Sequence, residues 1–194
     1  MLTIKENIEF ETIINKSRFI CLLYKINDVK NVNSILDDIK LKYKDATHYC
    51  FAYIVNNCIK FDDDGEPSNT AGKPILNVLE KNKLNNVLCV VVRYFGGIKL
   101  GAGGLTRAYT KSVTNSLNKD NIIELKEGYK IIITFDYTKN KVIDILLKDS
   151  KILNKEFNDI ITYEFIIDTE AYNEIYNALN IGCLSLSIID KVYI

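Results

Sequence analysis

Residues 87–104 read VLCVVVRYFGGIKLGAGG and join the most hydrophobic run of the chain to its most glycine-rich segment. Residues 87–94 are rich in β-branched side chains, which is typical of a strand buried on both faces. Residues 96–104, the glycine loop, hold five glycines in nine positions. The apolar spacing of residues 105–117 then predicts an amphipathic helix. A central strand, a glycine loop and a helix are therefore the expected centre of the fold.

Local signals before this centre predict a hairpin, a helix, a strand pair and a second helix. In that order they cover residues 7–14 with 18–26, 28–39, 49–55 with 59–61, and the segment from 74 onward. The strand pair is expected to turn at Asn56-Asn57, and Pro74 suits a first helical turn. The first part of the chain is therefore expected to mix helices with strands.

The pattern of elements changes after Gly128. Six segments predict a strand, a helix, two strands, a helix and a strand, at 129–137, 138–150, 151–157, 160–168, 169–180 and 183–193. This βαββαβ order is the ferredoxin-like arrangement. We therefore predict an α+β protein of two domains, one over 1–126 that carries the candidate site and a ferredoxin-like one over 127–194.

Positive charge is concentrated around the glycine loop, although the whole chain carries 25 basic and 25 acidic residues. No Asp or Glu lies between Glu80 and Asp120, whereas seven basic residues do: Lys81, Lys83, Arg93, Lys99, Arg107, Lys111 and Lys119. Such local asymmetry attracts an anion even at zero net charge. The alternative is that a buried strand and an amphipathic helix leave little room for acidic side chains.

Composition argues against several classes of protein. The N-terminal MLTIKENIEFE lacks the basic and apolar regions of a signal peptide, and no apolar run approaches the ~20 residues that span a bilayer. The five cysteines form no CxxC pair and there is one histidine, so neither a disulfide framework nor a metal site is expected. The sequence thus predicts a cytoplasmic protein with free thiols and with no membrane contact, metal or cofactor.

The glycine loop has the composition of an anion site. Glycine is entropically costly, so its density here indicates either positive φ angles or close approach to a ligand. The loop leads into a helix N-terminus, whose free N–H groups and dipole favour an anion. A tight strand-to-helix connection remains the alternative. A Rossmann fingerprint from Gly101 would need glycine where Thr106 stands, and no P-loop GK[ST] tripeptide occurs.

We predict that an anion or nucleic acid contacts this loop, its flanking strand and helix, and a second helix start near residue 70. The predicted binding residues are Thr70, Gly72, Lys73, Arg93, Tyr94, Gly96, Gly97, Lys99, Gly101, Gly103, Gly104, Arg107 and Lys111. Lys99 and Arg107 are expected to add charge-assisted hydrogen bonds.

The acidic segment DDDGEP at 62–67 does not encode a calcium loop. An EF-hand with Gly65 in sixth place would begin at Lys60 and end at Ala71, so both defining ligands are wrong. Acidic residues clustered beside Gly and Pro are most often solvated turn residues. Paired carboxylates for acid–base chemistry are the other interpretation.

The motifs DDGEPSNTAGKP at 63–74 and VVVRYFGGIKLGAGGLTRAY at 90–109, with KSRF at 16–19 and ATHYCFAY at 46–53, resemble those of the IMPACT/YigZ family. This resemblance covers nearly the whole chain. It implies a first domain with the ribosomal-protein-S5 domain 2-like fold and a ferredoxin-like second domain similar to the last domain of elongation factor G. Asn69 stands where the family usually has glycine, and because Asn tolerates the left-handed region we expect the loop conformation to persist.

The resemblance also implies a link to translation, because both folds recur in the translation apparatus and the eukaryotic relatives restrain the amino-acid-starvation kinase. The leading hypothesis is a non-catalytic module that binds RNA or the ribosome, with proteins of the translation apparatus as further partners. One alternative is an enzyme for a small phosphorylated or carboxylated substrate, with His48, Asp64 and Glu66 as candidate catalytic residues; another is a protein–protein adaptor. Convergence of these side chains with Arg93 in a closed pocket favours the enzyme, whereas basic side chains on an open face favour binding.

Overall fold

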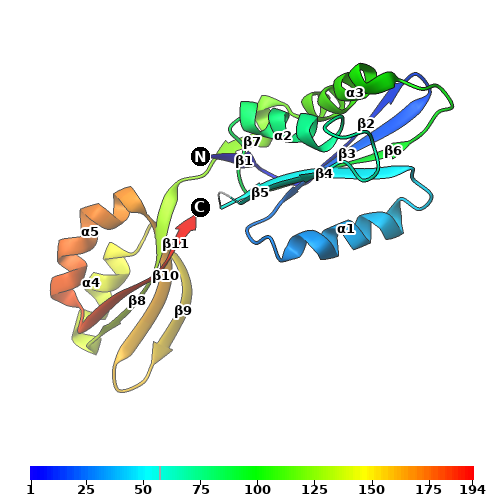
Figure 1. The fold of residues 1–194 in the computed structure, drawn as a ribbon. Coiled ribbons are helices and arrows are strands. Elements are labelled where there is room, and N and C mark those ends of the chain that lie inside the picture. Colours follow the sequence, from blue (N-terminus) through cyan, green and yellow to red (C-terminus); the bar gives the residue numbers. More distant parts are fainter. Residues whose placement is uncertain (57) are drawn as a thin grey trace. The chain divides into compact units, whose positions relative to one another are not determined.

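The computed structural model describes residues 1–56 and 58–194 and divides into two compact units, Met1–Glu124 and Leu125–Ile194. Each unit has its own sheet and its own apolar core (Figure 1). The turn predicted at Asn56-Asn57 includes a residue outside the described ones. The domain limits 1–126 and 127–194 stay a prediction, because they concern independent folding and compactness does not test it.

The first unit is built on a five-stranded antiparallel sheet in the order β2-β3-β6-β4-β5. Its strands are β1 (Leu2–Ile4), β2 (Ile8–Ile14), β3 (Ser17–Lys25), β4 (His48–Val55), β5 (Cys58–Asp62), β6 (Val87–Tyr94) and β7 (Ile122–Glu124). Its helices are α1 (Asn31–Lys42), α2 (Gly72–Lys81) and α3 (Gly101–Ser116), followed by the short 3-10 helix η1 (Lys119–Asn121). β1 pairs with β7 in a separate two-stranded sheet.

β6 lies at the centre of the sheet and is covered on both faces. Its side chains at Val87, Cys89 and Val91 pack in one core with α2 and α3, and those between them pack in another with α1. Figure 1 shows α2 and α3 on one face of the sheet and α1 on the other. A strand covered on both faces needs an apolar residue at every position. The central strand predicted from the continuous apolar run is therefore confirmed.

The end of β6 passes close to the β2–β3 hairpin at Gly96. A Cβ atom built on Gly96 would lie 2.0 Å from the carbonyl carbon of Lys16, and its backbone N–H donates to Ser17 Oγ at 3.1 Å. Two glycines that follow have left-handed backbone, with φ of +83° at Gly97 and +68° at Gly101. Part of the glycine density thus serves the path of the chain, as the alternative interpretation holds.

The second unit is ferredoxin-like. Its elements are β8 (Glu127–Phe135), η2 (Tyr137–Lys139), α4 (Asn140–Leu146), β9 (Lys151–Phe157), β10 (Ile161–Asp168), α5 (Thr169–Gly182) and β11 (Ser185–Tyr193). The antiparallel order β11-β8-β10-β9 places the first and third of these strands side by side in the centre. The predicted βαββαβ order and the α+β class are therefore confirmed.

The helix predicted at 138–150 is shorter than expected. The carboxylate of Asp136 accepts a hydrogen bond from the Thr138 backbone N–H at 2.9 Å, and this turn opens η2 before α4 begins. The helix α4 then ends at Leu146. A polar side chain that hydrogen-bonds its neighbouring backbone competes with helix formation, which periodicity alone does not reveal.

Three expected absences concern the described residues alone. No helix of this part of the chain has the length and apolar character that a membrane crossing requires. No group of three or more His, Cys, Asp or Glu side chains in it is placed to hold a metal ion. The cysteines are free thiols, and the sulfur atoms of Cys21 and Cys89 lie 3.7 Å apart in the core of the first unit.

We predict that Gly96→Ala destabilises the first unit by at least about 2 kcal/mol, because the added methyl group would overlap the backbone at Lys16. The matched control is Gly103→Ala, whose Cβ would make an ordinary contact 3.6 Å from the Arg107 side chain and whose alanine favours the helix. Urea unfolding followed by circular dichroism gives both free energies. Equal stability of the two variants would contradict the close approach at Gly96.

Candidate functional site

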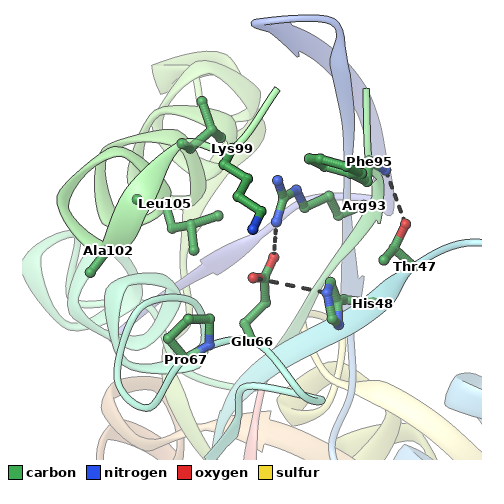
Figure 2. A pocket seen from close by; sticks show the side chains of 11 residues that line it. Thr47, His48, Glu66, Pro67, Arg93, Phe95, Lys99, Ala102 and Leu105 are labelled. Atoms are coloured by element: carbon green, nitrogen blue, oxygen red, sulfur yellow. Dashed lines mark hydrogen bonds and ion pairs between the residues drawn. The ribbon is translucent and has the colours of Figure 1, made fainter. Parts of the chain in front are cut away.

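The acidic loop (63–71), which joins β5 to α2, and the glycine loop meet at a pocket of about 390 Å³. The start of β4 completes the pocket. Its lining residues are Thr47, His48, Glu66, Pro67, Arg93, Phe95, Lys99, Leu100, Gly101, Ala102 and Leu105. Figure 2 shows the polar side chains of His48, Glu66 and Arg93 directed toward one another.

Glu66 is the central carboxylate of this pocket. Its Oε1 accepts hydrogen bonds from Arg93 Nη1 at 2.5 Å and from the Tyr109 hydroxyl at 2.8 Å. Cys50 extends the network by donating its thiol to the Tyr109 oxygen at 3.3 Å. The side chains of Glu66 and Arg93 are 3% and 5% exposed, so each charge depends on the other for compensation. The pair therefore ties the acidic loop to the central strand.

His48 is oriented by the backbone of the acidic loop. Its Nδ1 lies 2.7 Å from the carbonyl oxygen of Asp64. A carbonyl oxygen can only accept, so Nδ1 must carry a proton. In the neutral ring Nε2 is then an acceptor, and it lies on the pocket side, 3.9 Å from Glu66 Oε2. The fixed tautomer gives the pocket one hydrogen-bond acceptor that is not a carboxylate.

The two cations of the pocket differ in how far they are satisfied. Arg93 lies over the rings of Phe19 and Phe95, at 5.4 and 5.6 Å from their centroids. Its buried Nε has no hydrogen-bond partner among the described residues. Lys99 is exposed and forms no ion pair within the described part of the chain. Both side chains therefore retain donors that a ligand can use.

The N-terminus of α2 already holds a carboxylate of the protein. Asp63 Oδ1 accepts from the backbone N–H groups of Ala71 and Gly72 at 2.9 and 2.8 Å, and its Oδ2 accepts from Asn69 at 2.8 Å. Thr70 is buried and donates its hydroxyl to a backbone carbonyl. This corrects the expectation that Thr70 and Gly72 bind an external anion, because Asp63 occupies the donors of that helix end.

Two neighbours complete the account of this loop. Asn69 has φ of +61°, so the left-handed conformation expected at this position is confirmed. Lys73 lies with its Nζ 5.7 Å from the centroid of the Phe61 ring and does not line the pocket. Neither residue therefore contributes a group to the pocket.

The carboxylate of Asp64 is held by β4 instead of the pocket. Its Oδ2 accepts from the Tyr49 backbone N–H at 2.6 Å, and the residue does not line the pocket. Of the three candidate catalytic residues, the structure brings His48 and Glu66 together and leaves Asp64 to support His48 through its carbonyl group. The expected role of Asp64 as an acid or base is corrected accordingly.

The remaining predicted residues are divided between two hollows or belong to neither. The pocket takes Arg93, Lys99 and Gly101. A second hollow of about 350 Å³ beside α3 takes Gly104, Arg107 and Lys111, together with Ile14, Asn15, Leu100 and Ala108.

Tyr94, Gly96, Gly97 and Gly103 line neither hollow. Tyr94 donates its hydroxyl to the Lys44 carbonyl oxygen at 3.1 Å. Gly96 packs on the β2–β3 hairpin, as described above. The structure thus assigns Tyr94 and Gly96 to the framework of the site.

Pattern reasoning missed several residues that shape the pocket. Thr47, Pro67 and Leu105 line it without any spacing signal in the sequence. Tyr109 holds Glu66 from the apolar stripe of α3, where a single hydroxyl among apolar side chains was the available signal. A polar-tipped aromatic on a buried stripe needs a hydrogen-bond partner, and that partner is a site residue here.

Burial raises the pKa of the Cys50 thiol, and it also raises the pKa of the Tyr109 hydroxyl, to which Cys50 and Glu66 add. We predict that Cys50 resists iodoacetamide at mildly alkaline pH, because a raised pKa suppresses the reactive thiolate. The exposed Cys58 is the matched internal control and should be alkylated. Peptide mass spectrometry compares the two sites, and equal rates in the folded protein would contradict the buried network.

We predict that Glu66→Gln destabilises the first unit by about 3–5 kcal/mol, because it leaves the buried Arg93 charge uncompensated. The control is Glu11→Gln, which removes the exposed Arg18–Glu11 pair (50% and 38% exposed) and should cost at most ~1 kcal/mol. Urea unfolding measures both. Similar losses in the two variants would show that the Glu66–Arg93 pair does not hold the site together.

Comparison with known proteins places the chain in a family. Residues 15–117 match the Impact N-terminal domain. The IMPACT family member YvyE of Bacillus subtilis is 41% identical over 188 residues, which is 93% of this chain and 87% of that protein, and the IMPACT family member YigZ of Escherichia coli is 34% identical over 74% of each. A crystal structure described as a hypothetical protein has a TM-score of 0.66 at 28% identity, over 97% of both chains. The chain therefore belongs to the IMPACT family, as its motifs at 63–74 and 90–109 predict.

Proposed function

We propose that the first unit is a non-catalytic module that binds RNA, free or on the ribosome, and that it acts in this way in the regulation of translation. The link to translation rests on family membership. The RNA contact rests on one observation of the chain itself, which is a strip of unpaired cations beside α3. We call Lys99, Arg107 and Lys111 the basic strip.

The basic strip differs from the other exposed cations of the protein. Arg18, Lys42, Lys130 and Lys155 each form an ion pair at 2.9 Å or less with a nearby carboxylate. The three residues of the strip are exposed and form no ion pair with any described residue. Their segment has no acidic residue to pair with between Glu80 and Asp120. Unpaired cations grouped in this way favour contact with the phosphates of a nucleic acid.

The backbone beside the basic strip is open to a phosphate. Arg107 and Lys111 are one helical turn apart and line the second hollow with Gly104. Glycine at this position presents backbone instead of a side chain. Two adjacent cations beside exposed backbone are suited to successive phosphates of a strand.

An enzyme is the second candidate, because His48, Glu66 and Arg93 do converge in a pocket. The carboxylate of Glu66, however, is already engaged through Oε1 by Arg93 and Tyr109. A general base needs a carboxylate that can reach the substrate proton. The engaged carboxylate and the unpaired strip together favour binding over catalysis.

We predict that a fluorescein-labelled single-stranded RNA binds with an affinity that falls steeply as salt is added. Each phosphate contact contributes about 0.7 to the slope of log K against log salt concentration for single strands, so Arg107→Ala with Lys111→Ala should lower the slope by about 1.4. Fluorescence anisotropy over a salt series measures this slope.

The matched control is Lys141→Ala with Lys151→Ala, which removes two exposed and unpaired lysines from the second unit. It should leave the slope within error of the unsubstituted protein. If the two double variants change the slope equally, or if RNA does not bind at low salt, the proposed function fails.

A further inference from the structure

The pocket carries one positive charge more than it compensates. Arg93 and Lys99 contribute two positive charges to its lining, and Glu66 contributes the single carboxylate, which pairs with Arg93. In Figure 2 the side chain of Lys99 extends into the pocket toward this pair. The apolar wall strengthens the field of the remaining cation, because it excludes water. The pocket therefore suits one anionic group.

Donors from two independent sources face the same space. The Nε of Arg93 is buried without a hydrogen-bond partner among the described residues, although Arg93 itself lines the pocket and is 4% exposed. The first turn of α3 has no side-chain cap and no acidic residue, and its Gly101 and Ala102 also line the pocket. Buried donors are normally satisfied, and free N–H groups at a helix start favour oxyanions. A phosphate group matches both sets.

The rest of the pocket is suited to a flat, weakly polar body. Phe95 is 46% exposed and its ring is backed by the Arg93 guanidinium. Thr47 Oγ1 accepts from the Phe95 backbone N–H at 3.0 Å and so fixes this position. Figure 2 shows Phe95 on one side of the pocket and Leu105 on the other. An exposed ring facing an apolar wall is the arrangement on which a nucleobase stacks.

His48 supplies the remaining polar contact. Its Nδ1 proton is committed to the Asp64 carbonyl group, so its Nε2 is free to accept a hydrogen bond in the pocket. A sugar hydroxyl is a donor of the required kind. The pocket thus combines an anion subsite, a stacking surface and an acceptor in about 390 Å³, within the ~300–1,000 Å³ of small-ligand sites.

We propose that this pocket binds one phosphorylated nucleotide unit, with its phosphate at Lys99, Arg93 and the start of α3 and its base against Phe95. The nucleotide comes either from a phosphorylated end of RNA or from a free nucleoside monophosphate. The RNA source rests on the proposed function, and the free source does not. In the RNA case the basic strip binds the chain and the pocket binds its end.

The test compares one RNA sequence with 5′-phosphate, 3′-phosphate or hydroxyl ends by anisotropy, and free nucleoside monophosphates and inorganic phosphate by calorimetry. We expect one phosphorylated end, or the free nucleotide, to bind at least roughly tenfold more tightly than its dephosphorylated counterpart, as charge-assisted contacts imply. Lys99→Met should abolish this preference. Arg107→Met is the matched control, and it should weaken all RNAs equally while the preference persists.

The outcomes separate the two proposals. RNA binding without any end preference, together with no binding of free nucleotides, overturns the pocket proposal and leaves the RNA-binding module standing. Binding of free nucleotides that Lys99→Met abolishes, without RNA binding, supports the pocket and overturns the module. Inorganic phosphate binding as tightly as nucleotides, or Phe95→Ala leaving nucleotide affinity unchanged, overturns the assignment of a base to the pocket. Circular dichroism verifies that each variant is folded.

Discussion

The buried ion pair between Glu66 and Arg93 is the interaction on which the first unit's site depends. It joins the acidic loop, which has little regular structure, to the central strand of the sheet. Tyr109 brings α3 into the same contact by donating to Glu66. Because both charges are almost completely buried, the pair holds only while all three elements stay in place. The pocket is therefore a consequence of the packing that satisfies this carboxylate.

The two helix starts next to the pocket differ in what they have left to bind. Asp63 fills the N-terminus of α2 with three backbone hydrogen bonds, so that end is a structural joint. The N-terminus of α3 has no such carboxylate and lies beside Lys99 and Arg93. An anion from outside the protein can occupy the second but not the first. This asymmetry assigns binding to the glycine loop and stability to the acidic one.

Sequence reasoning predicted the features that depend on local pattern. The run at 87–94 predicted β6 because burial on both faces demands apolar side chains throughout, and the βαββαβ order predicted the second sheet. The role of Asp63 was not predictable from capping rules, since its acceptors serve N–H groups six to nine residues away. Thr47 and Leu105 reach the pocket through tertiary packing, which leaves no periodic trace.

The most direct test of the account follows backbone amide signals by NMR while RNA with phosphorylated ends is added to the protein. The account predicts the largest shift changes at Phe95 to Ala102 and along the α3 face of Arg107 and Lys111. It predicts little change at the Ala71 and Gly72 amides, which Asp63 already binds. Changes centred on those two amides, or confined to the second unit, would contradict the assignment of the binding site to the glycine loop and α3.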